Sequence, residues 1–118
     1  MYTDNILEHA THPRNYGSIP NCDSTKITNP VCGDELELYI EFSEKGTITN
    51  IKFSGVCCAL ATASASLTTD YVLGKNINDI KKIEPFTLYE LLGVTVSPMR
   101  ATCCTLVLDG LNNAIKDK

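Results

Sequence analysis

Apolar and polar residues alternate most regularly between Glu35 and Phe42, which predicts a half-buried strand with four residues facing inward: Leu36, Leu38, Ile40 and Phe42. The segment Ser43–Gly46 predicts a hairpin turn, and a second strand is expected from Ile48 to Ser54. A shorter strand is expected earlier, from Thr25 to Asn29. The three strands would form an antiparallel meander with one face free for helices.

Helical patterns flank this predicted sheet in the sequence. A short helix is expected from Tyr2 to Ala10, and a second follows Gly55, ends near Gly74 and carries an apolar stripe at helical spacing: Leu60, Ala63, Leu67 and Tyr71. Three more helices are expected at Ile77–Ile83, Phe86–Leu92 and Met99–Lys116. The predicted fold class is therefore α+β, with a small three-stranded antiparallel sheet packed against about four to five helices.

The composition is that of an ordinary globular protein. The chain has 118 residues and shows no linker, repeat or low-complexity tract, so we expect a single domain spanning residues 1–118. Its net charge of −4 and lack of a basic cluster argue against nucleic acid or an anionic membrane surface as partners. The absence of a secretory signal and of an apolar run long enough to cross a bilayer leads us to expect a cytoplasmic location.

Cysteine is the residue type that changes this picture, because the chain has six: Cys22, Cys32, Cys57, Cys58, Cys103 and Cys104. A disulfide framework is disfavoured, because such frameworks are typical of small exported chains. In addition, four of the six cysteines form two pairs of neighbours in the sequence, Cys57–Cys58 and Cys103–Cys104, which suits disulfide bonding poorly. Reduced thiols that bind metal or carry out sulfur chemistry are the better interpretation. The competing interpretation is that free cysteines fill the core as small apolar residues.

The thiols lie at the ends of predicted elements, which in an α+β fold can converge on one edge. Cys32 lies in a tight loop two residues before Asp34, and Cys103 and Cys104 lie in the early part of the last expected helix. Cys57 and Cys58 lie at the start of the helix after Gly55, where the dipole and unpaired N–H groups favour thiolate. Neighbouring helical residues point about 100° apart, so only one member of each pair would face a shared metal. Sulfur ligands select zinc, copper(I) or iron–sulfur clusters. A carboxylate is unusual in structural zinc sites. As a harder and weaker ligand than sulfur, it favours a cluster that is bound temporarily and then released.

Four motifs in order carry a resemblance over nearly the whole chain. They are His9 with Pro13–Gly17, the Asn-Pro-x-Cys-Gly-Asp sequence at Asn29–Asp34, the glycine, cysteine and Ala-Ser-x-Ser run within Gly55–Ser66, and a cysteine followed by a leucine-containing helix at Cys103–Leu106. The chain resembles the U-type iron–sulfur cluster assembly scaffolds, namely IscU, the N-terminal domain of NifU, and SufU.

This resemblance implies a ligand set of Cys32, Asp34, Cys58 and Cys103, with Asp34 associated with cluster lability. It also implies that the protein accepts persulfide sulfur from a cysteine desulfurase, collects iron, builds a [2Fe–2S] cluster and passes it to apo iron–sulfur proteins. Such a protein is a scaffold and sulfur acceptor rather than an enzyme in its own right. The resemblance to SufU leaves an alternative open, a zinc-binding persulfide acceptor with zinc in the resting form.

The chain departs from the family pattern at several positions. Thr102 stands where many IscU proteins have a histidine, the long SufU insertion is absent, and the chaperone-recognition motif is represented only by Ser97–Arg100. A dedicated chaperone is therefore not expected, whereas a homodimer that shares a cluster stays open. Three roles are open for the extra thiols, Cys57 and Cys104: spare ligand, persulfide acceptor or packing residue. Both histidines, His9 and His12, are expected to be structural or surface residues.

Two other function classes fit the sequence poorly. Ferredoxin-type electron carriers hold their clusters with four closely spaced cysteines, and thiol oxidoreductases use a Cys-x-x-Cys pair. The chain has neither pattern.

Overall fold

A computed structural model describes residues 3–30, 33–94 and 96–116 of the chain. Within these ranges it contains three strands and five helices: α1 (Asp4–Thr11), β1 (Ser24–Asn29), β2 (Asp34–Phe42), β3 (Ile48–Val56), α2 (Ala59–Val72), α3 (Ile77–Lys81), α4 (Pro85–Leu92) and α5 (Pro98–Ile115). The predicted α+β class is confirmed, with each observed element within a few residues of its expected position. No helix in the described part of the chain is long and apolar enough to cross a membrane.

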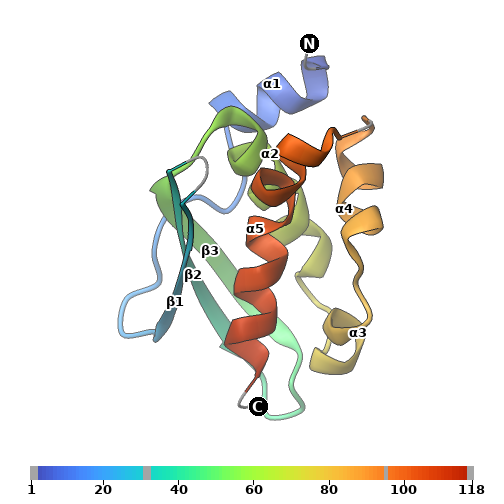
Figure 1. Cartoon of the computed structure of the whole chain (residues 1–118). Helices are drawn as coiled ribbons and strands as arrows, with labels where there is room; N and C mark the ends of the chain where they lie inside the picture. The colour runs from blue at the N-terminus through green and yellow to red at the C-terminus, as the bar shows by residue number, and fades with distance from the viewer. Residues whose placement is uncertain (1–2, 31–32, 95, 117–118) are drawn as a thin grey trace.

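The sheet is an antiparallel meander in the order β1-β2-β3 (Figure 1). At the β1–β2 connection, Asn29 is the cross-strand partner of Asp34, and the Gly33 N–H donates to the Asn29 carbonyl at 2.8 Å. At the end of β3, Gly55 has φ +128°, and an added Cβ would lie 2.0 Å from the Glu35 carbonyl oxygen. Only glycine fits this close approach, which leads the chain toward α2.

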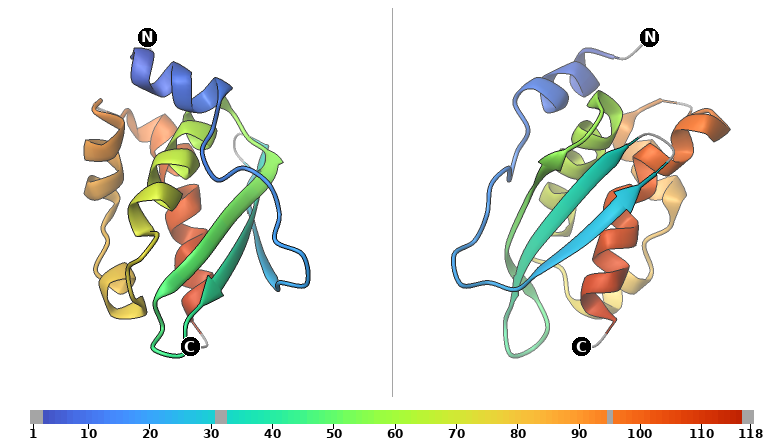
Figure 2. Two further views of the ribbon diagram at one scale, coloured as in Figure 1. Left: turned by 180° about the vertical axis from the view of Figure 1, so that it is seen from behind. Right: turned by 60° about the vertical axis from the view of Figure 1, so that its left-hand side comes forward.

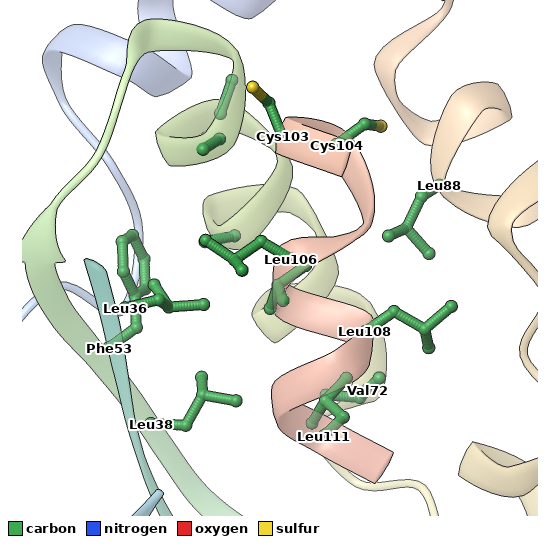
Figure 3. Packing of buried hydrophobic residues seen from close by; sticks show 14 of the residues in the cluster. Leu36, Leu38, Phe53, Val72, Leu88, Cys103, Cys104, Leu106, Leu108 and Leu111 are labelled. Carbon is green, nitrogen blue, oxygen red and sulfur yellow. The ribbon is translucent and has the colours of Figure 1, made fainter. Parts of the chain in front are cut away.

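The helices cover one face of the sheet, with α5 lying across it and α2 beside α5 (Figures 1 and 2). The core lies between them, where Leu36, Leu38 and Phe53 of the sheet face Leu106 and Leu111 of α5 (Figure 3). The strand alternation predicts Leu36 and Leu38 correctly. The remaining two residues of that pattern, Ile40 and Phe42, are only half-buried.

Helix α2 is enclosed by other elements on several sides, because it contacts α1, α4, α5 and β3. Its buried residues include four with hydroxyl groups: Ser64, Ser66, Thr68 and Thr69. The predicted apolar stripe is therefore wrong in part. Leu60 and Ala63 are buried as expected, but Tyr71 is exposed, and its ring lies 4.5 Å from the Lys75 ammonium nitrogen. A helix enclosed in this way has no single apolar face to predict.

Helix α1 is attached to α2 by a polar network rather than by apolar contact alone. His9 is buried, and its Nδ1 lies 2.7 Å from the Ser66 hydroxyl oxygen, which also accepts the Arg14 backbone N–H at 2.8 Å. The Arg14 guanidinium forms a 3.1 Å ion pair with Asp70. Both histidines were expected to be structural or surface residues, and the structure agrees, with His9 buried in this network and His12 largely exposed.

This network makes the stability of the fold sensitive to acid. Burial, followed by the positive charge of Arg14, lowers the pKa of His9 from its usual 6.5, and the opposing effects of Asp70 and Glu8 do not outweigh them. The folded state therefore favours the neutral imidazole of His9. The stability that this preference contributes is present above pH 6.5, the pKa of His9 in the unfolded chain, and it is lost as the pH falls toward the lower pKa of His9 in the folded protein. We expect the urea midpoint of the wild-type protein to fall between pH 7.5 and pH 5.5, and to fall clearly less in His9→Gln.

The matched control for this prediction is the other histidine. His12 lies exposed on the same segment, so His12→Gln should retain the wild-type dependence of the urea midpoint on pH. Equal pH dependence in His9→Gln and the wild-type protein would contradict the assignment to His9.

Candidate metal centre

Three side chains from separate elements converge where the start of β2, the start of α2 and the early part of α5 meet. They belong to Asp34, Cys58 and Cys103, and one ligand atom of each lies within 4.8 Å of the others. Asp34 and Cys103 are buried, whereas Cys58 is half-buried. These three elements begin at the same end of the molecule, the end at which α1 lies (Figure 1).

Cys58 is the N-cap of α2, and its sulfur takes the place that a serine oxygen often occupies. The Ala61 N–H donates to the Cys58 Sγ at 3.4 Å, and the Cys58 N–H donates to the Asp34 Oδ1 at 2.8 Å. The second carboxylate oxygen of Asp34 lies 3.8 Å from the Cys58 sulfur. Both side chains thus accept backbone N–H groups at the start of α2, where these donors have no partner within the helix. The local fold thus holds a carboxylate and a thiol together at one helix terminus.

Cys103 reaches the same place from α5. It is fully buried, and the side-chain amide of Asn29 donates to its sulfur at 3.8 Å and to the Thr102 hydroxyl at 3.3 Å. Asn29 also faces Asp34 across the β1–β2 pair. The end of β1 is thereby joined to the first turns of α5, beside the three converging side chains.

The other members of the two cysteine pairs lie outside this group. Cys57 donates its thiol hydrogen to the Glu35 carbonyl oxygen at 3.3 Å, whereas Cys104 leaves α5 in a different direction from Cys103 and is fully buried in the core (Figure 3). Burial raises the pKa of both thiols to about 11, with the negative charges of Asp34 and Cys58 adding to the effect at Cys57. Both residues are therefore protonated at neutral pH, and the thiol form is a poor ligand and a poor nucleophile.

The structure thus brings together three of the four side chains in the predicted ligand set. The fourth, Cys32, lies outside the described residues. Sequence reasoning singled out the motif that contains Asn29 but gave this residue no role. A signal was present, because the period-two pattern of β1 puts Asn29 on the same face as Ile27, which packs against the core.

The donor set of two sulfurs and one carboxylate oxygen fits a metal ion that accepts both soft and hard ligands. Two sulfurs suit zinc, copper(I) or iron in a cluster, and the carboxylate contributes a harder ligand that exchanges more readily. Hydrogen bonds from the Ala61 N–H and the Asn29 amide already reach the two sulfurs. Such bonds stabilise the negative charge of metal-bound thiolates.

Comparison with known proteins gives a consistent family relationship. The family model of the NifU-like N-terminal domain matches residues 1–117. The chain is 37% identical to iron sulfur cluster assembly protein 1, mitochondrial, from Candida glabrata, covering 99% of this chain but only 56% of that protein. It is 36% identical to iron-sulfur cluster assembly scaffold protein IscU 1 from Archaeoglobus fulgidus, covering 99% of this chain and 76% of that protein.

A solved structure from Fervidobacterium islandicum, described as a candidate iron–sulfur cluster assembly scaffold protein for the SUF system, superposes with a TM-score of 0.83. The match covers 97% of this chain and 96% of that one at 24% identity, so it supports the fold alone. The family match and the two relatives agree. The chain belongs to the NifU-like N-terminal domain family.

Proposed function

We propose that this protein is an iron–sulfur cluster assembly scaffold, and the observation that carries the proposal is the convergence of Asp34, Cys58 and Cys103 within 4.8 Å. Cys32 would complete the ligand set from the adjoining loop. The cargo is a [2Fe–2S] cluster, built from iron and from sulfur that a cysteine desulfurase supplies as persulfide. An external thiol reductant provides the two electrons that convert each persulfide sulfur to sulfide, and the cluster is then passed to apo iron–sulfur proteins. A cytoplasmic setting, where thiols stay reduced, fits this chemistry.

The mixture of ligands supports release rather than permanent retention. Ferredoxin-type clusters, which are held permanently, have four thiolate ligands, whereas here one position falls to a carboxylate, which binds iron less strongly than sulfur does. An acceptor protein's thiolate can displace this ligand first. The three described donors also belong to three different elements, so a small shift of one element changes the site.

A zinc-binding persulfide acceptor is the second candidate function. The two sulfurs, Cys58 Sγ and Cys103 Sγ, favour it, since zinc readily takes sulfur ligands in a tetrahedral site and can also bind a carboxylate oxygen. In that case zinc would occupy the site at rest, and one thiolate would accept the persulfide sulfur while zinc stayed bound.

Cluster transfer is the experiment that distinguishes these functions. The protein would be incubated without oxygen with iron, cysteine and a cysteine desulfurase, followed by visible absorption, and then mixed with an apo-ferredoxin. We expect a cluster that forms and moves to the acceptor. A cluster that forms but stays would identify a carrier, and sulfur uptake with zinc retained and no cluster would identify the persulfide acceptor.

Substitution of Cys58 should separate its two roles. Cys58→Ser keeps a good N-cap but removes the soft ligand, so we expect a folded protein that assembles no stable cluster. Cys58→Ala should lose the cap as well, at a cost of about 1 kcal/mol in the free energy of unfolding. Cluster absorption and urea unfolding measure the two effects.

The matched control is the adjacent thiol, because Cys57 points toward the Glu35 carbonyl instead. Cys57→Ser should assemble the cluster at the wild-type level. Normal assembly in Cys58→Ser together with loss in Cys57→Ser would move the ligand to the other member of the pair.

Replacement of Asp34 tests the role of the carboxylate. Asp34→Ala removes the ligand that an incoming thiolate would displace, so we expect a longer-lived cluster and a severalfold slower transfer to apo-ferredoxin. The exposed neighbour provides the control, and Glu35→Ala should transfer its cluster at the wild-type rate. An Asp34→Ala protein that forms no cluster at all would instead make the carboxylate an indispensable ligand.

A further inference from the structure

Asn29 is a buried polar residue beside the metal centre that the proposed ligand set leaves without a role. Its side chain is 5% exposed, and it is the last residue of β1, on the face that packs against α5. A buried amide costs free energy unless it is hydrogen-bonded, so its partners indicate what it does.

The contacts of Asn29 reach three parts of the site at once. Its amide nitrogen has two hydrogens, one directed to the Cys103 sulfur at 3.8 Å and the other to the Thr102 hydroxyl at 3.3 Å. Its backbone carbonyl oxygen accepts the Gly33 N–H at 2.8 Å, which links Asn29 to the residue that precedes Asp34. Across the sheet it is paired with Asp34.

We propose that Asn29 is a positioning residue that fixes the Cys103 sulfur toward Asp34 and Cys58 and stabilises its negative charge when a metal is bound. The inference deepens the proposed function and rests on it for the nature of the cargo. An N–H group directed at a thiolate lowers the energy of the sulfur lone pairs, and hydrogen bonds of this kind tune metal affinity and the electronic properties of clusters. The amide is neutral, so it provides this effect without a competing charge.

The simpler explanation is that Asn29 only satisfies local hydrogen bonds and joins β1 to α5. Replacement would then change the free energy of unfolding but leave the electronic state of a metal bound to Cys103 unchanged. A spectroscopic signal from the sulfur–metal bond therefore separates the two explanations.

The probe is Co²⁺ alone, titrated into the reduced full-length protein without oxygen. Thiolate-bound Co²⁺ absorbs in the near ultraviolet by charge transfer from sulfur to metal, and loss of a hydrogen bond to sulfur moves this band to longer wavelength. Two variants remove the donor. Asn29→Leu keeps the branched shape of the side chain but is larger, and Asn29→Ala is smaller and carries no risk of overpacking, so the pair guards against a variant that does not fold. The control Thr102→Val removes the hydroxyl to which the amide also donates and leaves Asn29 and Cys103 unchanged.

We expect the Asn29 variants to bind Co²⁺ about ten- to a hundredfold more weakly, with the charge-transfer band at longer wavelength, and Thr102→Val to keep the wild-type band. An unchanged band in an Asn29 variant with native circular dichroism would overturn the inference while leaving the proposed function intact. Co²⁺ binding without any charge-transfer band in the wild-type protein would overturn the ligand set itself, and this inference with it.

Discussion

The enclosure of α2 is the constraint on which the rest of the structure depends. A helix that contacts α1, α4, α5 and the sheet leaves little room for large side chains, and most of its buried residues are alanine, serine or threonine. The hydroxyl groups then need partners in the surrounding elements. Ser64 bonds to the Cys104 carbonyl of α5, and Ser66 to His9 and Arg14. These bonds set the positions of α1 and α5 relative to α2. The position of α5 in turn sets the distance between Cys58 at the start of α2 and Cys103 in α5.

The sequence was sufficient to predict the positions of the strands and helices, but not to predict which side chains of every element are buried. Strict alternation in β2 identified Leu36 and Leu38, because a sheet with one covered face leaves no choice of inward side. The same reasoning failed for Tyr71, since an amphipathic pattern assumes a helix with one covered face, and α2 has several. The spacing of apolar residues predicts the buried face of a helix that packs against a single layer. It does not predict the buried residues of a helix that is covered on several sides.

The candidate site was predictable to the level of local geometry. Helix geometry showed that only one cysteine of each adjacent pair could face a shared site, and the family register selected Cys58 and Cys103, the two that the structure places beside Asp34. The contact of Asn29 with Cys103 was not predictable. It depends on the packing of β1 against α5, two elements about 70 residues apart in the chain, and no local pattern encodes that contact.

One sulfur atom in this protein belongs both to the fold and to the chemistry. The Cys58 Sγ terminates α2 by accepting the Ala61 N–H, and it also faces Asp34 and Cys103. Oxidation of this sulfur to a sulfinic or sulfonic acid would end its use as a ligand and, by changing its size and charge, disturb the N-terminus of α2. Chemical damage to the site is thereby also damage to the fold, so an inactivated molecule becomes one that unfolds and is degraded more readily.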